Sequence, residues 1–461
     1  MKLTLDKVAE YTQGTGCFNG AAAATGYSID TRTLAPGDLF FAIRSERDGH
    51  DFVEQALAKG AVAAVVDHKG AARFASQANL IVVEDTLLAL QRLGAAVRRL
   101  WGRTLIGVTG SVGKTTTKEI IAHVLGAQFK VHKTAENFNN HLGLPLQLLR
   151  LEPEHEIAVM ELGMSHAGEI TALAELAQPE VGVVTNVAPV HLEFFDSICG
   201  IARAKYELIE SLPAGGVAVL NADDEYVAQF GRDFKGRVLR YGTAPAADVQ
   251  AENVRLLGAA GSEFEAICDG SRHTVKLPLA GRHNVLNALA AVAVALSQGM
   301  DPAKAVAALA TVPVPGGRGE RIEVDGVTLV SDCYNSNPKA LEAMLEVLAS
   351  LPATRRVVVA GQMLELGAES AALHAQCGQL AAAKGIDVVL GVAGDALHLA
   401  QKALQCGAMA GFVEDAGQAG RWMARHLRAG DVVLVKGSHG VHLERAIEEF
   451  QSQRANGANE N

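Results

Sequence analysis

The chain has 461 residues, of which 49% are hydrophobic and 20% are charged, and its formal net charge is −10. This length exceeds what one ordinary core supports and predicts about two to four domains. The acidic balance argues against a nucleic-acid partner, which would favour a basic face. The six cysteines are scattered without a C-x-x-C pair, so they indicate neither a zinc site nor a disulfide framework.

The first segment, "MKLTLDKVAE", lacks the apolar core of a signal peptide. No run of the sequence approaches the roughly 18 apolar residues of a membrane-spanning helix. We therefore expect a soluble cytoplasmic protein with reduced thiols and no stable membrane insertion.

Residues 1–100 have the pattern of a small α/β domain. The apolar segments 38–43, 61–66 and 80–84 are short, as expected of buried strands. A helix is predicted over 52–60, between the first two strands, and a second one over 87–102 ends the domain.

The stretch "GVTGSVGKTTTKE", residues 107–119, joins a predicted strand over 103–109 to a predicted helix over 113–129. Glycines allow several backbone N–H groups to point at an anion, and the helix N-terminus adds partial positive charge. In such a loop the lysine reaches the outer phosphates and the next hydroxyl ligates magnesium. The pattern is G-x-x-G-K-T-T, because Val108 stands where the longer motif has its first glycine. The predicted phosphate site comprises Gly110, Ser111, Val112, Gly113, Lys114, Thr115 and Thr116.

Strands and helices continue to alternate over residues 101–313, with strands predicted in 156–162, 181–187 and 216–224. This alternation predicts a mostly parallel sheet with helices on both faces. The stretch 245–278 is different, because it has the pattern of short antiparallel strands and turns. Helices over 283–299 and 302–312 follow.

Polar residues follow two of these strands, where an open parallel sheet binds its ligands. Glu161 ends one strand and is a natural magnesium ligand, although it would serve equally well as a loop cap. His191 follows Thr185 and Asn186 at the end of the next strand, and a lone histidine is more often a surface or core residue. Lys205 lies 14 residues beyond His191, and its residue type alone indicates a solvated helix face.

Amides and charges elsewhere allow two interpretations each. Asn137, Asn139 and Asn140 suit sugar hydroxyls or peptide bonds, but they also suit a turn and a helix cap. Asn284 and Asn287 share one face near a helix start, where they could contact a ligand or simply cap the helix.

The segment "PVPGGRGER", residues 313–321, is rich in proline and glycine and predicts a domain boundary. Its Arg318 is placed to reach the outer phosphates of ATP, or it is a solvated charge. Asp332 ends a predicted strand, where it would accept from ribose hydroxyls or close a turn.

Residues 314–461 begin with a predicted hairpin over 321–332 whose turn is Asp325–Gly326. Strands predicted in 355–361, 387–394 and 431–437, each with a helical partner, indicate a second nucleotide-fold-like unit. The polar tail, residues 451–461, is expected to be disordered.

Taken in order, these motifs resemble the Mur ligase family. The segments that carry the resemblance are "GVTGSVGKTTTKE", "TAENFNNHLGLPL", "ELGMSHAGEI", "TNVAPVHLEFF", "GIARAKYEL", "HNVLNALAA", "DCYNSNP", "MLELGAES" and "VLVKGS". The segments "SIDTRTLAPGDLFFAI" and "DGHDF" are similar to the part of the family that grips a UDP-sugar. The resemblance covers nearly the whole chain, and the ordered set is highly specific.

The resemblance implies an α/β protein of three domains: an N-terminal UDP-sugar-binding domain (1–100), a central P-loop ATPase domain with a parallel sheet (101–313) and a C-terminal Rossmann-like domain (314–461). It implies an ATP-dependent amide ligase of cytoplasmic peptidoglycan precursor synthesis. The partners would be UDP-N-acetylmuramoyl-tripeptide and D-alanyl-D-alanine, joined through an acyl phosphate. We expect a monomer.

The resemblance also implies roles for single residues. Lys114, Glu161, His191 and Lys205 would be catalytic, with Thr115 and Glu161 on one magnesium ion and His191 and Lys205 on a second. Lys205 would carry a carbamate derived from CO2. Asn284 and Asn287 would lie near the adenine, Arg318 near the phosphates and Asp332 near the ribose. The substrate would contact Ser28, Asp30, Arg32, His50, Asn137, Asn139 and Asn140.

Three alternatives remain. A neighbouring Mur ligase that adds a diamino acid to UDP-N-acetylmuramoyl-dipeptide shares the "DTR" and "GDLF" segments, but it usually carries a D-N-P-R signature that this sequence lacks. A folylpolyglutamate-type ligase shares the phosphate loop but is not expected to have a UDP-binding domain. An ATP-binding switch or scaffold would need the loop, but not Glu161, His191 and Lys205 together.

Overall fold

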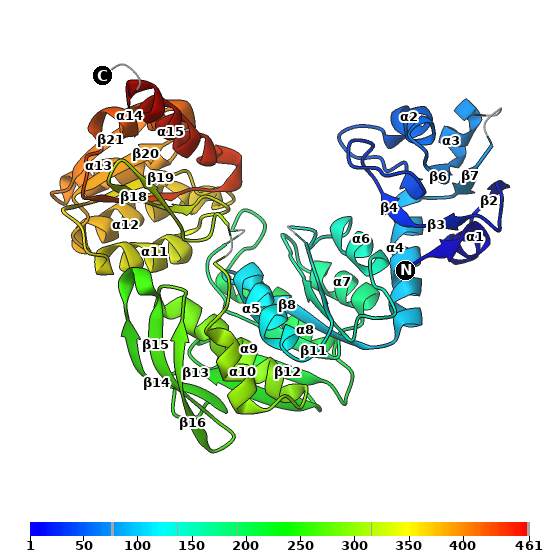
Figure 1. The fold of residues 1–461 in the computed structure, drawn as a ribbon, viewed down its shortest axis with the longest axis horizontal. Coiled ribbons are helices and arrows are strands. Elements are labelled where there is room, and N and C mark those ends of the chain that lie inside the picture. Colours follow the sequence, from blue (N-terminus) through cyan, green and yellow to red (C-terminus); the bar gives the residue numbers. More distant parts are fainter. Residues whose placement is uncertain (75–77, 136, 191, 315, 459–461) are drawn as a thin grey trace.

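The structure is a computed structural model and describes residues 1–74, 78–135, 137–190, 192–314 and 316–458. Three large sheets follow one another along the chain and form three successive units (Figure 1). The central unit lies between the N-terminal unit, drawn in blue, and the C-terminal unit, drawn in yellow to red. The predicted three-part α/β organisation is confirmed, whereas the boundaries at 100/101 and 313/314 stay predictions.

In the described part of the N-terminal unit, five strands form a sheet in the order β2-β7-β6-β5-β4. Its strands from β4 to β7 pair in parallel, and β2 pairs antiparallel at the edge. The elements of this unit are β1 (Leu3–Thr4), α1 (Leu5–Thr12), β2 (Thr15–Cys17), β3 (Ala23–Ala24), β4 (Gly26–Ser28), β5 (Asp38–Phe41), α2 (Val53–Ala58), β6 (Ala63–Asp67), α3 (His68–Ala71), β7 (Leu80–Val83) and α4 (Thr86–Trp101). The strands and helices predicted between residues 38 and 102 are therefore confirmed.

Helix α4 joins the N-terminal unit to the central unit. It packs against α1 on one side and against α6 and α7 of the central unit on the other. Its Leu90, Leu93 and Val97 are fully buried in one apolar core that includes side chains of both units. A shared core of this kind fixes the two units to each other more firmly than a flexible linker would.

The central sheet, as far as it is described, has nine strands in the order β16-β15-β14-β13-β12-β11-β8-β10-β9. Strands β8 to β14 pair in parallel, and β14, β15 and β16 pair antiparallel, as the sequence predicts. The elements are β8 (Thr104–Thr109), α5 (Lys114–Gly126), β9 (Val131–Lys133), α6 (Gly143–Leu149), β10 (Ile157–Glu161), α7 (Glu169–Ala177), β11 (Val181–Val184), α8 (Ile198–Glu210), β12 (Val217–Asn221), β13 (Arg237–Gly242), β14 (Val249–Leu256), β15 (Ser262–Cys268), β16 (Ser271–Leu277), α9 (Arg282–Ser297) and α10 (Pro302–Leu309).

The alanine-rich segment of the sequence forms α9, which packs against α5, α10 and the sheet. Every residue from Asn287 to Ala295 is buried. Small side chains let the helix approach its neighbours closely on all sides, which explains why its composition is apolar throughout. Within the described part of the chain, no helix is long and apolar enough to cross a membrane.

The C-terminal unit, over residues 316–458, has a sheet in the order β17-β18-β22-β19-β20-β21, in which the β17–β18 pair is antiparallel and the other described pairs are parallel. Its elements are β17 (Glu320–Val324), β18 (Val327–Asp332), α11 (Pro338–Ser350), β19 (Arg355–Gly361), α12 (Ser370–Ala383), β20 (Val388–Val392), α13 (Ala396–Gln405), β21 (Met409–Val413), α14 (Ala416–His426), β22 (Asp431–Lys436) and α15 (Glu444–Ala458). The predicted hairpin is confirmed, because Asp325 and Gly326 join β17 to β18 with φ of 49° and 75°.

The expected disorder of the polar tail is wrong for residues 451–458, which continue α15. The cause lies upstream, where Ala446, Ile447 and Phe450 are buried in the C-terminal core and fix the start of the helix. A hydrogen bond of 2.7 Å from Gln453 Nε2 to Glu449 Oε1 supports the next turn. Residues 459–461 lie outside the described residues.

Arg98 of α4 holds the end of α7 in the central unit. Its side chain is 3% exposed, and its Nε donates to the carbonyl of Ala177 at 2.6 Å. One Nη donates at 2.8 Å both to the carbonyl of Gln178 and to a carboxylate oxygen of Glu180. A cation at a helix C-terminus satisfies carbonyls that lack partners within the helix.

We predict that Arg98→Ala lowers the free energy of unfolding by about 2–4 kcal/mol, because buried carbonyls lose their donor. Urea denaturation followed by circular dichroism measures the change. Arg99→Ala is the matched control, because Arg99 is exposed on the same helix and should change stability by less than about 0.5 kcal/mol. Equal stability of the two variants would contradict this role of Arg98.

Candidate active site

The phosphate loop, residues 110–113, turns sharply between β8 and α5. Gly110 and Gly113 have φ of 147° and 84°, in the region that favours glycine. A Cβ at Gly110 would overlap the Thr185 hydroxyl, and one at Gly113 would lie 2.9 Å from Asn287 Oδ1. Both positions therefore require glycine for conformation and for space.

The two residues that follow β11, Thr185 and Asn186, hold this loop by hydrogen bonds. The Thr185 hydroxyl donates to the Val112 carbonyl at 2.7 Å, and Asn186 Nδ2 donates to the same oxygen at 2.9 Å. The Val112 N–H donates to Asn186 Oδ1 at 3.0 Å, and the Ser111 N–H donates to the Asn186 carbonyl at 2.9 Å. The sequence places Thr185 and Asn186 at a strand end but gives no sign that they hold the loop.

Ser111 faces the protein. Its hydroxyl accepts from the Ala188 N–H at 2.9 Å and donates to the Ala188 carbonyl at 3.2 Å. These contacts join the phosphate loop to the segment that follows β11.

Lys114 lies across the loop, where its Nζ donates to the Gly110 carbonyl at 2.8 Å. Burial lowers the pKa of Lys114; the charge of Glu161 opposes this shift and the charge of Arg318 adds to it. A mobile side chain that ends in a point charge at the mouth of such a loop suits the outer phosphates of a nucleotide.

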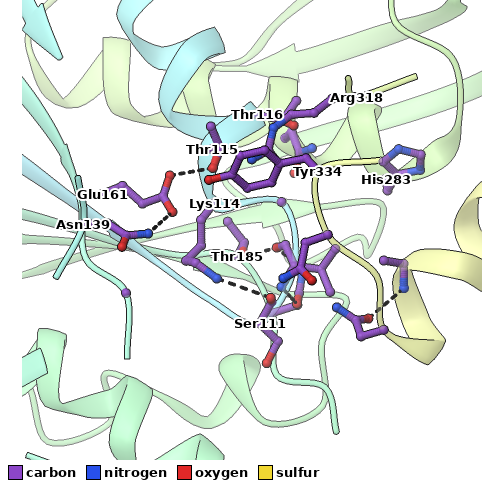
Figure 2. Close-up of a pocket in the computed structure, with 18 of the residues that line it drawn as sticks. Ser111, Lys114, Thr115, Thr116, Asn139, Glu161, Thr185, His283, Arg318 and Tyr334 are labelled. Atoms are coloured by element: carbon purple, nitrogen blue, oxygen red, sulfur yellow. Dashed lines mark hydrogen bonds between the residues drawn. The ribbon is translucent and has the colours of Figure 1, made fainter. Parts of the chain in front are cut away.

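Glu161, at the end of β10, is the carboxylate beside this loop, and it is 3% exposed. One oxygen accepts from the Thr115 hydroxyl at 2.6 Å and the other from Asn139 Nδ2 at 2.7 Å. Figure 2 shows both bonds. The structure therefore brings together Thr115 and Glu161, which the sequence predicts as ligands of one ion. Hydroxyl and carboxylate oxygens are the donors that Mg²⁺ prefers.

Lys205 in α8 is 1% exposed, so the solvated helix face that its residue type indicates is wrong. Burial lowers the pKa of Lys205 well below its ordinary value, and the nearby charge of Lys114 adds to the effect. His191 lies outside the described residues. No cluster of three His, Cys, Asp or Glu side chains that could hold a metal occurs among the described residues, so the predicted second ion stays a prediction.

The two asparagines of α9 form a chain of hydrogen bonds that ends on α5. Asn284 Nδ2 donates to the Ala280 carbonyl at 2.8 Å, and Asn287 Nδ2 donates to Asn284 Oδ1 at 3.1 Å. The Thr117 hydroxyl donates to Asn287 Oδ1 at 3.0 Å. Asn287 therefore supports the first turn of the helix after the phosphate loop, while Asn284 is partly exposed.

The C-terminal unit contributes Asp332, Lys436, Arg318 and Tyr334. Lys436 ends β22, is 2% exposed, and donates to Asp332 Oδ2 at 2.6 Å and to the Asn335 carbonyl at 2.7 Å. The guanidinium of Arg318 lies 4.0 Å from the centre of the Tyr334 ring. Sequence reasoning missed Lys436 as a site residue, although its position at a strand end was a usable signal.

A cavity of about 1420 Å³ unites most of these residues; the central and C-terminal units line most of it, and α1 and α4 of the N-terminal unit line the rest. Its lining includes the following predicted site residues: Ser111, Val112, Gly113, Lys114, Thr115, Thr116, Asn139, Asn140, Glu161, Asn284, Asn287, Arg318 and Asp332. Asn140 Oδ1 also accepts from the Leu142 and Gly143 N–H groups, at 3.1 and 2.9 Å, where α6 begins. Asn137 is exposed and is not part of the lining.

The predicted sugar-nucleotide residues lie apart from this cavity, in the N-terminal unit. Ser28 ends β4, and its hydroxyl donates to the Asp30 carbonyl at 2.9 Å. Arg32 is exposed and pairs with the Asp30 carboxylate through Nε at 3.0 Å and Nη2 at 2.7 Å. This pair leaves donors of Arg32 facing solvent, where a ligand has access to them.

His50 is fully buried, unlike the ligand contact that the resemblance implies. Its Nδ1 is 2.6 Å from Asp48 Oδ1, and its Nε2 accepts from the Asp67 N–H at 3.1 Å. Burial alone would raise the pKa of Asp67, but hydrogen bonds from Arg44 and Gly70 and the charge of Arg44 lower it to about 2. Because both ring nitrogens have protein partners and the ring is enclosed, His50 holds its loop and offers no contact to a ligand.

The fold and the cavity define a class: a P-loop nucleotide-binding enzyme whose site lies where two α/β units meet. Three family models match the chain in order. The "Mur ligase family, catalytic domain" matches residues 24–98, the "Mur ligase middle domain" matches 108–295, and the "Mur ligase, glutamate ligase domain" matches 317–439.

Similar proteins agree with these matches. UDP-N-acetylmuramoyl-tripeptide–D-alanyl-D-alanine ligase of Bacillus subtilis is 37% identical, over 98% of each chain. A crystal structure of MurF from Acinetobacter baumannii has a TM-score of 0.88 at 31% identity and covers 98% of this chain and 99% of that one. MurF ligase from Thermotoga maritima in complex with ADP has a TM-score of 0.81 at 29% identity, over 94% and 98%. The chain belongs to the Mur ligase family and is an enzyme of the ligase class.

We predict that Asn186→Ala weakens nucleotide binding about tenfold, because Val112 loses two of the hydrogen bonds that orient its peptide groups. Calorimetric titration with ADP and Mg²⁺ measures the affinity. Asn253→Ala is the control, because Asn253 is exposed on β14. This variant should bind ADP with the affinity of the unchanged protein. Unchanged affinity in Asn186→Ala would mean that the loop holds its shape without this brace.

Proposed function

We propose that the chain is an ATP-dependent ligase that joins D-alanyl-D-alanine to UDP-N-acetylmuramoyl-tripeptide in cytoplasmic peptidoglycan precursor synthesis. One observation carries the proposal. The phosphate loop, Thr115 and Glu161 line the same cavity, and residues of the C-terminal unit line its other side. Two other findings support it: the relative from Bacillus subtilis bears this activity as its name, and the Thermotoga maritima neighbour holds ADP.

The chemistry requires an activated carboxylate, because a free carboxylate is a poor electrophile. The tripeptide carboxylate oxygen attacks the γ-phosphorus of ATP, the bond from that phosphorus to the bridging oxygen breaks, and ADP leaves. The dipeptide amine then attacks the acyl phosphate carbon. Inorganic phosphate leaves with the carboxylate oxygen, and the amine loses a proton as the amide forms.

The cationic side chains at the cavity suit the first of these steps. Lys114 and Arg318 neutralise charge that develops on the transferring phosphoryl group. Asp332 accepts from the ribose hydroxyls, with Lys436 holding its carboxylate, and Asn284 lies near the adenine. The cavity excludes water from the acyl phosphate when the two units enclose the substrates.

Magnesium belongs to this proposal, because the oxygen donors of Thr115 and Glu161 fit it. An ion held there would supply charge neutralisation to the nucleotide phosphates. Lys205 carries the CO2-derived carbamate, and with His191 it serves a second ion. Burial supports this assignment, because only a neutral amine adds CO2 and burial favours the neutral form.

The remaining parts of the substrate extend away from the phosphate loop. Ser28, Asp30 and Arg32 receive the UDP moiety on the N-terminal unit, with residues 1–100 as that domain. Asn139, Asn140 and Asn137 face the sugar or the peptide. Residues 101–313 and 314–461 are the ATPase and ligase domains, and the enzyme is a monomer.

Phosphate release from ATP and Mg²⁺ tests the proposal when each substrate is added alone and in pairs. We expect release only with UDP-N-acetylmuramoyl-tripeptide and D-alanyl-D-alanine together. Release with UDP-N-acetylmuramoyl-dipeptide and a single diamino acid would move the assignment to the neighbouring ligase. Slow release that is indifferent to both substrates would favour an ATP-binding switch.

Lys205→Ala tests the carbamate. We expect turnover to fall by at least about a hundredfold while ADP binding stays within twofold, because the variant loses a charged ligand and keeps the phosphate loop. Added acetate or formate should restore part of the rate by replacing the carboxylate.

Arg203→Ala is the matched control, because Arg203 is exposed on the same helix and its loss should leave turnover unchanged. If Lys205→Ala kept full turnover, the second metal site would be wrong.

A further inference from the structure

Arg318 lies just before β17, where the Gly317 N–H donates to Glu320 Oε2 at 3.0 Å and the Gly319 N–H donates to the Ser331 carbonyl at 2.9 Å. Its neighbours Gly317 and Gly319 have φ of 65° and 80°, conformations that glycine adopts at low cost. These bonds hold the backbone on both sides of Arg318, but its long side chain has many rotamers, so its place at the cavity has to be held by a side-chain contact. The face of Tyr334 provides that contact, with the guanidinium carbon 4.0 Å from the ring centre.

Tyr334 comes from a firmly held loop. Lys436 bonds to Asp332 and to the Asn335 carbonyl on either side of the tyrosine, at 2.6 and 2.7 Å. Asn337 caps α11, since its Oδ1 accepts from the Ala340 N–H at 2.9 Å. The ring is therefore a fixed part of the C-terminal unit, and the arginine is the adaptable partner.

Arg318 and the phosphate loop face the same space. Both line the cavity, and Figure 2 shows Arg318 and Tyr334 beside Thr116, over the loop that carries Lys114. Two cations that face one space form an anion site, and the negative face of an aromatic ring offsets part of their repulsion.

We propose that Tyr334 is a positioning residue whose ring holds the Arg318 guanidinium over the phosphate loop, where it contacts the outermost phosphate of ATP. This inference rests on the proposed function and deepens it. It makes Tyr334 of the C-terminal unit responsible for the placement of a cation whose own backbone does not fix its side chain. The ring acts through Arg318 and has no part in the chemical step.

The test compares the affinities of two nucleotides, the non-hydrolysable ATP analogue AMP-PCP and ADP, by calorimetry with Mg²⁺. For Tyr334→Leu we expect about fivefold weaker binding of the analogue and ADP binding within twofold, because only the analogue has the outermost phosphate. Tyr334→Phe keeps the aromatic face and should bind both nucleotides nearly as the unchanged protein does. Arg318→Ala should show the same selective loss, and the double variant should lose no more than Arg318→Ala alone.

Three results would overturn the proposal. Equal losses for both nucleotides in Tyr334→Leu would mean that the ring contacts the nucleoside part. A loss of affinity in Tyr334→Phe as large as in Tyr334→Leu would assign the effect to the hydroxyl. If the double variant lost as much affinity as the two single variants together, the ring would not act through Arg318. Nucleotide binding needs no turnover, so these results are independent of the phosphate-release test of the proposed function.

Discussion

The site depends on one constraint: the turn of residues 110–113 has to be held open by the strand beside it. The Val112 carbonyl is bonded by Thr185 and Asn186, so it points into the protein and away from the concave side of the loop. Glycine is required at 110 because the Thr185 hydroxyl occupies the space of a Cβ, and at 113 because Asn287 Oδ1 would lie 2.9 Å from a Cβ there. Because β11, β8 and β10 are parallel neighbours, Thr185 and Asn186, the phosphate loop and Glu161 all lie at the carboxyl ends of adjacent strands.

The central and C-terminal units each supply part of the site. The central unit supplies the phosphate loop and the carboxylate, both held by buried hydrogen bonds. The C-terminal unit supplies Asp332 and Tyr334 from a loop that Lys436 fixes. A site split in this way is complete only while the units face each other, and it therefore links the position of the C-terminal unit to the nucleotide.

Sequence reasoning predicted what short-range pattern determines. The strand–helix alternation, the Asp325–Gly326 turn and the phosphate loop all follow from local residue types. Burial of polar residues did not follow: Lys205, His50 and Lys436 are enclosed by elements far away in the sequence. Tertiary contacts also decided the polar tail, because Phe450 anchors the helix that continues through it. Such outcomes depend on which elements pack together, and residue type alone does not fix them.

The central claim is that the γ-phosphoryl group of ATP is transferred to the tripeptide carboxylate and activates it. An isotope label tests this claim most directly. UDP-N-acetylmuramoyl-tripeptide labelled with ¹⁸O in the reacting carboxylate is incubated with ATP, Mg²⁺ and D-alanyl-D-alanine, and the released phosphate is analysed by mass spectrometry. Transfer through an acyl phosphate predicts one ¹⁸O in each phosphate released during amide formation. Unlabelled phosphate from the labelled substrate would show that the γ-phosphoryl group goes to water and would contradict the account.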